Sequence, residues 1–161
     1  SAVSLALLKD GRSCLGMVYH PYLDEFFRAV AGGGAYLNGR RIRVSSRPME
    51  EAVIGFGTTP YQKAMGDKTF AALSRLFRQC RDVHRSGSAA IDLAYLACGR
   101  MDGFFECRLQ PWDYAAGKIL IEEAGGILTD FDGNDPNWKA SSIVAGNPLL
   151  FEALRTGLPE V

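Results

Sequence analysis

Hydrophobic and polar positions alternate over the first 44 residues of the chain. Three apolar runs of strand length, VSLALL, CLGMVYH and EFFRAVA, are separated by turn residues. Asp10-Gly11 and Asn38-Gly39 each lie between such runs, and both dipeptides favour the positive φ angles of a type I′ turn. We therefore predict an antiparallel meander of strands over residues 1–45.

The pattern changes near residue 46, after which strand-like runs alternate with helical ones. The predicted strands are AVIGFG, a short one near RDVHR, DGFFEC, ILTDF and SSIVAG. The first predicted helix starts at Asp67 as N-cap and stops at Cys80. The second runs from Ser88 to Gly99, and the third runs from near Trp112 to Gly125-Gly126. A short last helix is capped by Asn147 and has Pro148 as its first residue. This alternation predicts an α/β domain over residues 46–161 with a mainly parallel sheet, whose ligand sites lie in strand-to-helix turns.

The charge balance narrows the possible partners. The chain has 161 residues, of which 47% are hydrophobic, and its 18 Lys and Arg equal its 18 Asp and Glu. A neutral chain has no general attraction to nucleic acid or to an anionic membrane, so we expect neither as a direct partner. One stretch, RLFRQCRDVHR, still forms a local basic patch.

The location is expected to be cytoplasmic. Apolar runs end well short of the roughly 20 residues that span a bilayer, and the start SAVSLALLKDG lacks the features of a signal peptide. The four cysteines show no C-x-x-C spacing, and only two histidines accompany them. We predict reduced thiols rather than a zinc site or a disulfide framework.

The stretch HRSGSAA, residues 84–90, runs from a strand into a helix with Gly87 at the bend. The amides of Ser88, Ala89 and Ala90 would then point outward at the positive end of the helix dipole, which suits an anion. Ser88 as a simple N-cap, followed by alanines of high helix propensity, is the simpler explanation of the same residues, because serine is so common at N-caps. Both interpretations stay open on this stretch alone.

Asp113 also has two interpretations. It is either the N-cap of the following helix, with Trp112 packed in the core, or one of two carboxylates that converge on a cleft. The second carboxylate would be Glu106, which ends a strand seven residues earlier. Paired carboxylate oxygens suit Mg²⁺ together with a substrate phosphate.

Three other groups of residues are weaker candidates. Asp130, Asp132 and Asp135 in DFDGND do not fit the spacing of a calcium loop, so we interpret them as a solvated turn. The two histidines form no recognisable catalytic triad. GGGAY lacks the Lys and Ser/Thr of a phosphate-binding P-loop.

Taken together, several motifs resemble the inositol monophosphatase family. WDYAAG followed by EEAGGILTDFDG, with RSGSAAIDLAYLACGRMDGFFE upstream, is similar to the C-terminal signature of that family, and CLGMVYHPYLDEFFRAVAGGGAYLNGRRI is similar to its middle strands. The resemblance implies the layered αβαβα sugar-phosphatase fold. It also implies a Mg²⁺-dependent, lithium-sensitive phosphomonoesterase that acts on inositol monophosphate or a related sugar phosphate, often as a homodimer.

The resemblance assigns roles to five residues. Asp113 would be a metal ligand that also touches a substrate hydroxyl, and Glu106 would bind sugar hydroxyls. Gly87, Ser88 and Ala89 would face the substrate through their backbone. A carboxylate at Glu106 fits a polyol better than a nucleotide, because it accepts hydrogen bonds from hydroxyls and repels a second phosphate.

The sequence also departs from the family pattern. The family's other metal ligands, a glutamate and an Asp-Pro-x-Asp-Gly-Thr loop, have no match in this chain. We therefore expect the C-terminal part of the enzyme: residues 1–45 would belong to an incomplete N-terminal domain and residues 46–161 to a C-terminal α/β domain. No catalytic residue is predicted within the chain, which we expect to be inactive on its own.

Alternatives remain within and outside this activity. A fructose-1,6-bisphosphatase or a histidinol-phosphate phosphatase would be similar to the same family. A protein of a different class, a non-catalytic protein-binding or regulatory module, is also compatible with a chain that lacks most metal ligands.

Overall fold

The computed structural model of the chain describes residues 1–159, and its first part is a five-stranded antiparallel meander. The strands are β1 (Val3–Lys9), β2 (Arg12–His20), β3 (Glu25–Val30), β4 (Gly34–Leu37) and β5 (Arg40–Ile42), and each pairs with the next. At the last hairpin Asn38 and Gly39 have φ angles of 47° and 79°, as a type I′ turn requires. The predicted meander is confirmed.

The second sheet is mixed. Its strands are β6 (Val53–Phe56), β7 (Asp82–His84), β8 (Gly103–Leu109), β9 (Ile127–Asp130) and β10 (Ser141–Gly146), in the order β7-β6-β8-β10-β9. Strand β6 is parallel to β7 and β8, whereas β10 is antiparallel to both β8 and β9. The prediction of a mainly parallel sheet is therefore wrong for the β9–β10 half. No helix lies between β9 and β10, so the chain returns directly as an antiparallel neighbour.

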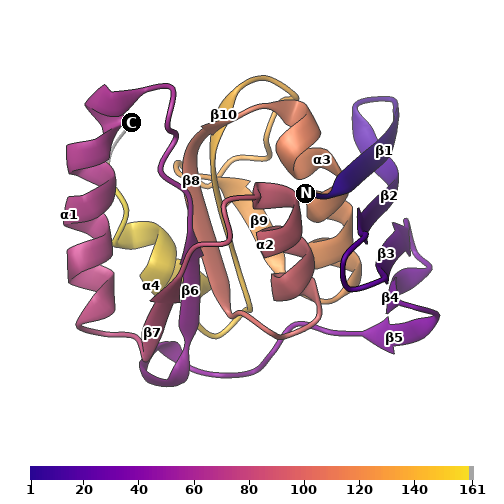
Figure 1. Ribbon diagram of the computed structural model, residues 1–161, viewed down its shortest axis with the longest axis horizontal. Coiled ribbons are helices and arrows are strands. Elements are labelled where there is room, and N and C mark those ends of the chain that lie inside the picture. The colour runs from indigo at the N-terminus through magenta and orange to yellow at the C-terminus, as the bar shows by residue number, and fades with distance from the viewer. Residues whose placement is uncertain (160–161) are drawn as a thin grey trace.

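Four α-helices cover the second sheet, and two of them lie between the sheets (Figure 1). Helices α2 (Ala89–Ala97) and α3 (Pro111–Glu123) pack against both sheets, whereas α1 (Gly66–Phe77) and α4 (Phe151–Thr156) cover the outer face of the second sheet. Short 3₁₀ turns occupy Met49–Glu51 and Lys63–Met65. Within residues 1–159 no helix combines the length and the apolar character needed to cross a bilayer.

Two of the predicted helix starts are wrong. Helix α1 begins at Gly66, so Asp67 lies inside its first turn instead of capping it. Asn147 does accept hydrogen bonds, at 2.9 Å from the amide of Leu149, but α4 begins only at Phe151. The stops at Gly99 and Gly125 are confirmed, since these residues have φ angles of 76° and 86°, the left-handed region that favours glycine. The stop at Cys80 is wrong, because α1 ends at Phe77.

The α3 layer is tied closely to the first sheet. A Cβ atom at Gly16 of β2 would lie 2.7 Å from the carbonyl oxygen of Ala116, so only glycine allows the strand to approach this helix so closely. The Glu123 carboxylate at the end of α3 accepts hydrogen bonds of 2.7 Å from the amides of both Gly32 and Gly34. The two sheets thus share one core, and a domain boundary between residues 45 and 46 stays a prediction.

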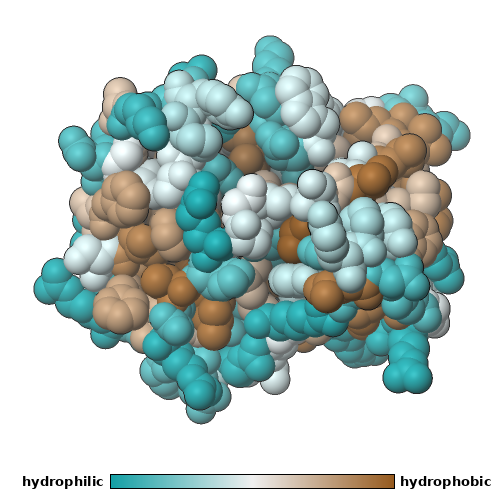
Figure 2. Space-filling model, in the orientation of Figure 1, coloured by the Kyte–Doolittle hydropathy of each residue, from teal (hydrophilic) through white to brown (hydrophobic). Residues whose placement is uncertain are grey.

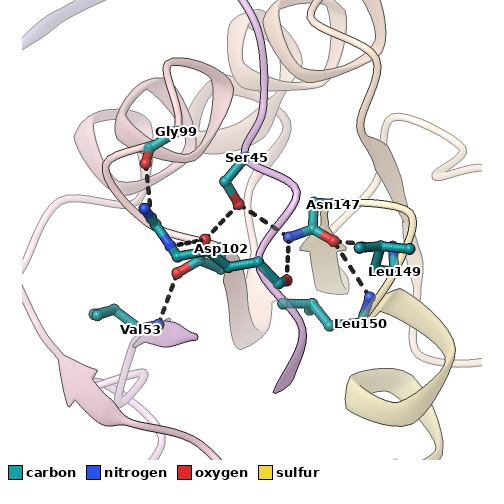
Figure 3. Close-up of polar contacts among 8 residues, drawn as sticks. Ser45, Val53, Gly99, Asp102, Asn147, Leu149 and Leu150 are labelled. Carbon is teal, nitrogen blue, oxygen red and sulfur yellow. Dashed lines mark hydrogen bonds and ion pairs between the residues drawn. The ribbon is translucent and has the colours of Figure 1, made fainter. Parts of the chain in front are cut away.

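A buried polar cluster joins the segment between the sheets to the second sheet (Figure 3). The fully buried Asp102 carboxylate accepts hydrogen bonds from Ser45, from Arg47 Nε at 2.9 Å and from the amide of Val53 at 2.8 Å. Asn147 donates to both Ser45 Oγ and the Arg47 carbonyl. The cluster is fully hydrogen-bonded at Asp102, which is what a buried charge requires.

The outer face of the first sheet is apolar and exposed, and hydrophobic atoms gather over the β1 end of the molecule in Figure 2. On β1, Val3, Leu5 and Leu7 are 61%, 50% and 58% exposed, and their side chains project from the same face of the strand. Within residues 1–159, β1 is an edge strand with β2 as its one partner. An exposed apolar face of this kind is suited to contact with another protein segment.

Candidate functional site

A cavity of about 720 Å³ lies where strands of the second sheet end and helices α2 and α3 begin. Its lining includes all the residues that the sequence predicts for the site, namely Gly87, Ser88, Ala89, Glu106 and Asp113. These residues come from the turn after β7, from β8 and from the first turn of α3. The structure thus brings them together at the carboxyl ends of parallel strands, where α/β sheets bind ligands.

The carboxylate of Glu106 is held at the wall of this cavity. Its Oε1 accepts a hydrogen bond of 3.1 Å from the amide of Thr59. Burial raises the pKa of Glu106, and the negative charges of Asp113 and Asp92 raise it further. A half-buried carboxylate with one oxygen already fixed can accept hydrogen bonds from ligand hydroxyls with the other.

Two residues beside Glu106 have an unusual backbone conformation. Thr59 and Arg108 have φ angles of 45° and 52°, in the left-handed region, and both line the cavity. This conformation is costly for a β-branched residue such as Thr59. A hydrogen bond of 2.5 Å from Thr59 Oγ1 to the carbonyl of Cys107 stabilises it. Such strain is typical of functional sites, where surrounding structure enforces a geometry that serves binding.

The turn before α2 differs in part from its prediction. Gly87 has a φ angle of 85°, and Ser88 occupies the N-cap position without a side-chain capping bond. The interpretation of Ser88 as a capping side chain is therefore wrong. The Ser88 amide donates a hydrogen bond of 3.0 Å to Ser86 Oγ. The prediction that this amide is free to bind an anion is therefore wrong. The following amides of α2 have no intrahelical acceptor, as at every helix N-terminus.

Asp113 stabilises its helix from inside it. It is the third residue of α3, and its Oδ2 accepts a hydrogen bond of 2.9 Å from the amide of the N-cap residue Gln110. The interpretation of Asp113 as N-cap is thus wrong, because Asp113 lies within the first turn and accepts its hydrogen bond from the amide of the N-cap residue. Trp112 is 70% exposed, which contradicts the expectation that it packs in the core.

Asp92 is a site neighbour that the sequence prediction missed. It lies on α2, is 1% exposed, and its Oδ1 has no hydrogen-bond partner in the described part of the chain. Burial raises its pKa to about 6, against the opposing effects of Ser86, His84 and Arg85. The signal in the sequence was a single acidic residue within the apolar run AAIDLAYLA.

The residues present do not form a complete metal site. Among residues 1–159 no group of three or more His, Cys, Asp and Glu side chains is arranged to hold a metal ion. Asp113 and Glu106 line the same cavity, but Mg²⁺ bound by protein takes further oxygen ligands. Within residues 1–159 these two carboxylates alone therefore do not complete a Mg²⁺ site.

The weaker candidates lie elsewhere. Asp130 and Asp132 line a separate cavity of about 350 Å³, and Asp135 forms an ion pair with Lys118. The two histidines do not line the main cavity. All four cysteines are free thiols.

Known proteins with similar sequences have two kinds of names. "Nus factor SuhB" of Escherichia coli (strain K12) is 44% identical over 154 residues, which cover 95% of this chain and 58% of that protein. "Inositol-1-monophosphatase" of Rhizobium meliloti (strain 1021) is also 44% identical, over 155 residues that cover 96% of this chain and 58% of that protein. The chain thus spans 58% of the length of these relatives.

Solved structures share the fold. The extragenic suppressor protein suhB from Bartonella henselae has a TM-score of 0.93 at 39% identity, with 99% of this chain and 61% of that chain covered. Inositol monophosphatase from Anabaena (Nostoc) sp. PCC 7120 has a TM-score of 0.92 at 38% identity, with 98% and 67% covered. The sequence pattern of the inositol monophosphatase family matches residues 1–159. With this match and the fold it shares with suhB and inositol monophosphatase, the chain belongs to the inositol monophosphatase family.

Proposed function

We propose that the chain is the substrate-binding, C-terminal part of a Mg²⁺-dependent phosphomonoesterase that hydrolyses inositol monophosphate or a related sugar phosphate. One observation carries the proposal: Glu106, Asp113 and the turn before α2 line a single cavity. Family membership supports a phosphatase, and the family is generally metal-dependent. Mg²⁺ and sensitivity to lithium belong to the proposal.

Glu106 is proposed to orient the polyol. Its Oε1 is occupied by the amide of Thr59, so the remaining oxygen accepts hydrogen bonds from substrate hydroxyls. Partial burial strengthens these bonds, because competing water is largely removed. A substitution that removes the carboxylate would thus weaken binding of the sugar more than binding of free phosphate.

The turn at Gly87, Ser88 and Ala89 is proposed to contact the substrate through its backbone. Small side chains let a ligand approach α2, and the helix dipole favours oxygen atoms of partial or full negative charge. Ser86 stabilises this turn, since its hydroxyl accepts from the Ser88 amide and donates to the Ser88 carbonyl at 3.2 Å.

Asp113 is the proposed metal ligand of this part of the protein. One of its oxygens is bonded to the Gln110 amide, and the other remains for a cation or a substrate hydroxyl. When bound, Mg²⁺ would supply electrostatic stabilisation of the phosphate and a water of lowered pKa. The remaining ligands are not among residues 1–159, so we propose that this chain alone has no turnover.

The test combines intact mass with phosphate release. The intact mass of the purified protein is measured by mass spectrometry. The same protein is then incubated with myo-inositol 1-phosphate, with and without Mg²⁺, and phosphate release is measured. A chain of 17.5 kDa should show no turnover, whereas a longer polypeptide that contains it should show Mg²⁺-dependent turnover. Turnover by the 17.5 kDa chain would contradict the claim that its ligand set is incomplete.

Two variants of the longer polypeptide separate the roles of the carboxylates. Glu106→Gln should raise KM for the sugar phosphate with a smaller effect on Mg²⁺ dependence. Asp113→Asn should shift the Mg²⁺ requirement to higher concentration. Asp132→Asn, an exposed carboxylate outside the main cavity, is the matched control and should change neither.

A second candidate function rests on the names of the relatives. Proteins called "Nus factor SuhB" and proteins called "Inositol-1-monophosphatase" are equally similar to this chain. A regulatory module that binds other proteins would retain the fold and the exposed apolar face of β1 without needing metal ligands. In that case Asp113→Asn would leave partner binding intact. Fructose-1,6-bisphosphatase and histidinol-phosphate phosphatase activities stay alternatives within the family.

We also propose that the protein forms a homodimer through α1 and β7. Phe70 and Phe77 are each 55% exposed and line an apolar groove of about 370 Å³ with Val83 of the edge strand β7. Phe77→Glu should convert a dimer to a monomer, as measured by light scattering coupled to size-exclusion chromatography. The four free thiols favour a cytoplasmic location, which completes the proposal.

A further inference from the structure

We propose that Arg108 selects substrates that carry a second anionic group besides the reacting phosphate. The inference rests on the proposed phosphatase function and names its substrate class more closely: phosphate esters of polyols with an additional phosphate or carboxylate. Arg108 is the one basic residue among the described residues that line the main cavity.

A β-bulge directs Arg108 towards this cavity. In the pairing of β8 with β10, Glu106 is opposite Ile143 and Leu109 is opposite Ser141, so two residues of β8 face the single residue Ser142. Arg108 is one of these two, with a φ angle of 52°. Bulges of this kind re-aim a side chain and are frequent beside active sites.

The conformation at Arg108 favours glycine. An arginine in the left-handed region is less stable than a glycine at the same position, because its Cβ crowds the backbone there. The hydrogen bond from Thr59 Oγ1 to the carbonyl of Cys107, the other residue of the bulge, stabilises the bulged backbone. A position that would be more stable with glycine yet carries a long cation indicates a role for the charge.

The guanidinium group of Arg108 has no ion pair or side-chain hydrogen bond within residues 1–159. Arg108 is exposed, and it lines both the main cavity and the smaller one. Asp130 and Asp132 line the smaller cavity and would repel an anion there. The second anionic group is therefore bound on the side of the main cavity, where Arg108 offsets the negative charge of Glu106.

The experiment compares two esters that differ by one phosphate. Dissociation constants of myo-inositol 1-phosphate and myo-inositol 1,4-bisphosphate are measured by calorimetry in the presence of Mg²⁺, with the 17.5 kDa chain, which is expected to hydrolyse neither ester. Wild type should bind the bisphosphate about tenfold more tightly than the monophosphate. Arg108→Gly should reduce this ratio to about one, and Arg108→Lys should give an intermediate ratio, because an ammonium group keeps the charge without the two-pronged geometry.

Stability and a control variant keep the result interpretable. Arg108→Gly should raise Tm by about 2–4 °C, because it relieves the backbone strain, so lost selectivity cannot be attributed to unfolding. Arg81→Gln removes one positive charge just before β7, away from the cavity, and should preserve the tenfold ratio.

The outcomes distinguish the role of Arg108 from the proposed phosphatase function. Equal affinity of wild type for both esters, or an Arg108→Gly variant that keeps the wild-type ratio, would overturn the role of Arg108 and leave the phosphatase proposal standing. A wild type that binds neither ester would overturn both.

Discussion

Gly57 and Glu106 are in such close contact that a methyl group at Gly57 would overlap the Glu106 carboxylate. Gly57 follows β6, and its amide donates to the carbonyl of Phe105 on β8 at 3.0 Å, so the backbone at this point is fixed. The absence of a side chain at Gly57 therefore creates the space in which Glu106 lies.

We expect Gly57→Ala to displace Glu106 and to break its hydrogen bond with the amide of Thr59. The free energy of unfolding should fall by on the order of 1–3 kcal/mol, which is typical of overpacking in a fixed backbone. Binding of inositol phosphate, measured by calorimetry, should be lost or reduced at least tenfold, as estimated for a lost charged hydrogen bond. Gly66→Ala is the control, because a Cβ there has open space and Gly66 starts a helix. Normal binding by Gly57→Ala would show that Glu106 does not orient the ligand.

Gly87 and Gly125 offer a matched pair. Both have left-handed φ angles, 85° and 86°, and a Cβ atom would meet no close neighbour at either position. Each Gly→Ala substitution should therefore cost about 1 kcal/mol of backbone strain, measured by denaturant unfolding. The two variants should differ in ligand binding alone, since Gly87 lines the main cavity and Gly125 does not. Equal binding by both variants would exclude the turn at Gly87 from the site.

Asp92→Asn should change how stability depends on pH. The folded protein binds the Asp92 proton more tightly than the unfolded chain, because its pKa is raised from 3.8 to about 6. This contribution is complete below pH 3.8 and is lost as the pH rises through 6, so wild type should lose stability relative to Asp92→Asn between about pH 4 and 7. The difference should reach roughly 3 kcal/mol at most.

Urea unfolding at several pH values gives this difference directly. Asp132→Asn, which replaces an exposed carboxylate, should run parallel to wild type over the same range. A stability difference between wild type and Asp92→Asn that is independent of pH would contradict the raised pKa of Asp92.

Asp102→Ala should destabilise the protein by about 3 kcal/mol, because it leaves Arg47, Ser45 and the amide of Val53 without their shared acceptor. Lys118→Met is an informative comparison. Its partners Glu122 and Asp135 are 45% and 71% exposed, so water replaces the lost ion pairs and the cost should be about 1 kcal/mol or less. Thermal unfolding of both variants measures the two stability losses. Equal losses would show that the exposure of the partner groups does not determine the cost of removing a buried charge.

Local patterns predicted most of the fold. Asn38-Gly39 indicated its hairpin because both residues tolerate positive φ, and Gly125-Gly126 marked the end of α3 for the same reason. The direction of β10 could not be predicted in this way, because an apolar run such as SSIVAG carries no information about its neighbours. Asp67 was misplaced because helix boundaries depend on tertiary contacts as well as on capping preferences.

The sequence predicted those residues of the candidate site whose side chains have a recognisable chemical role. Glu106 and Asp113 were recognisable as carboxylates near a predicted strand end and a predicted helix start, and the structure places both at one cavity. The expectation that Glu106 ends its strand is wrong, because β8 continues to Leu109. Arg108 and Thr59 gave no such signal, because their backbone conformation arises from a bulge and a hydrogen bond that only the folded sheet forms. Asp92 was visible in the sequence as an acidic residue, but the lack of a hydrogen-bond partner at its Oδ1 is a property of the packed core.

The bond between Asp113 and the amide of Gln110 limits how this carboxylate can act. With Oδ2 engaged by the helix, the side chain is held in one orientation, and Oδ1 is the oxygen left for a ligand. A ligand then meets an acceptor that is already oriented, so little side-chain entropy is lost on binding. Bidentate coordination of a cation by Asp113 would break the hydrogen bond between its carboxylate and the Gln110 amide at the start of α3. The affinity of a cation at Asp113 is thereby coupled to the stability of α3.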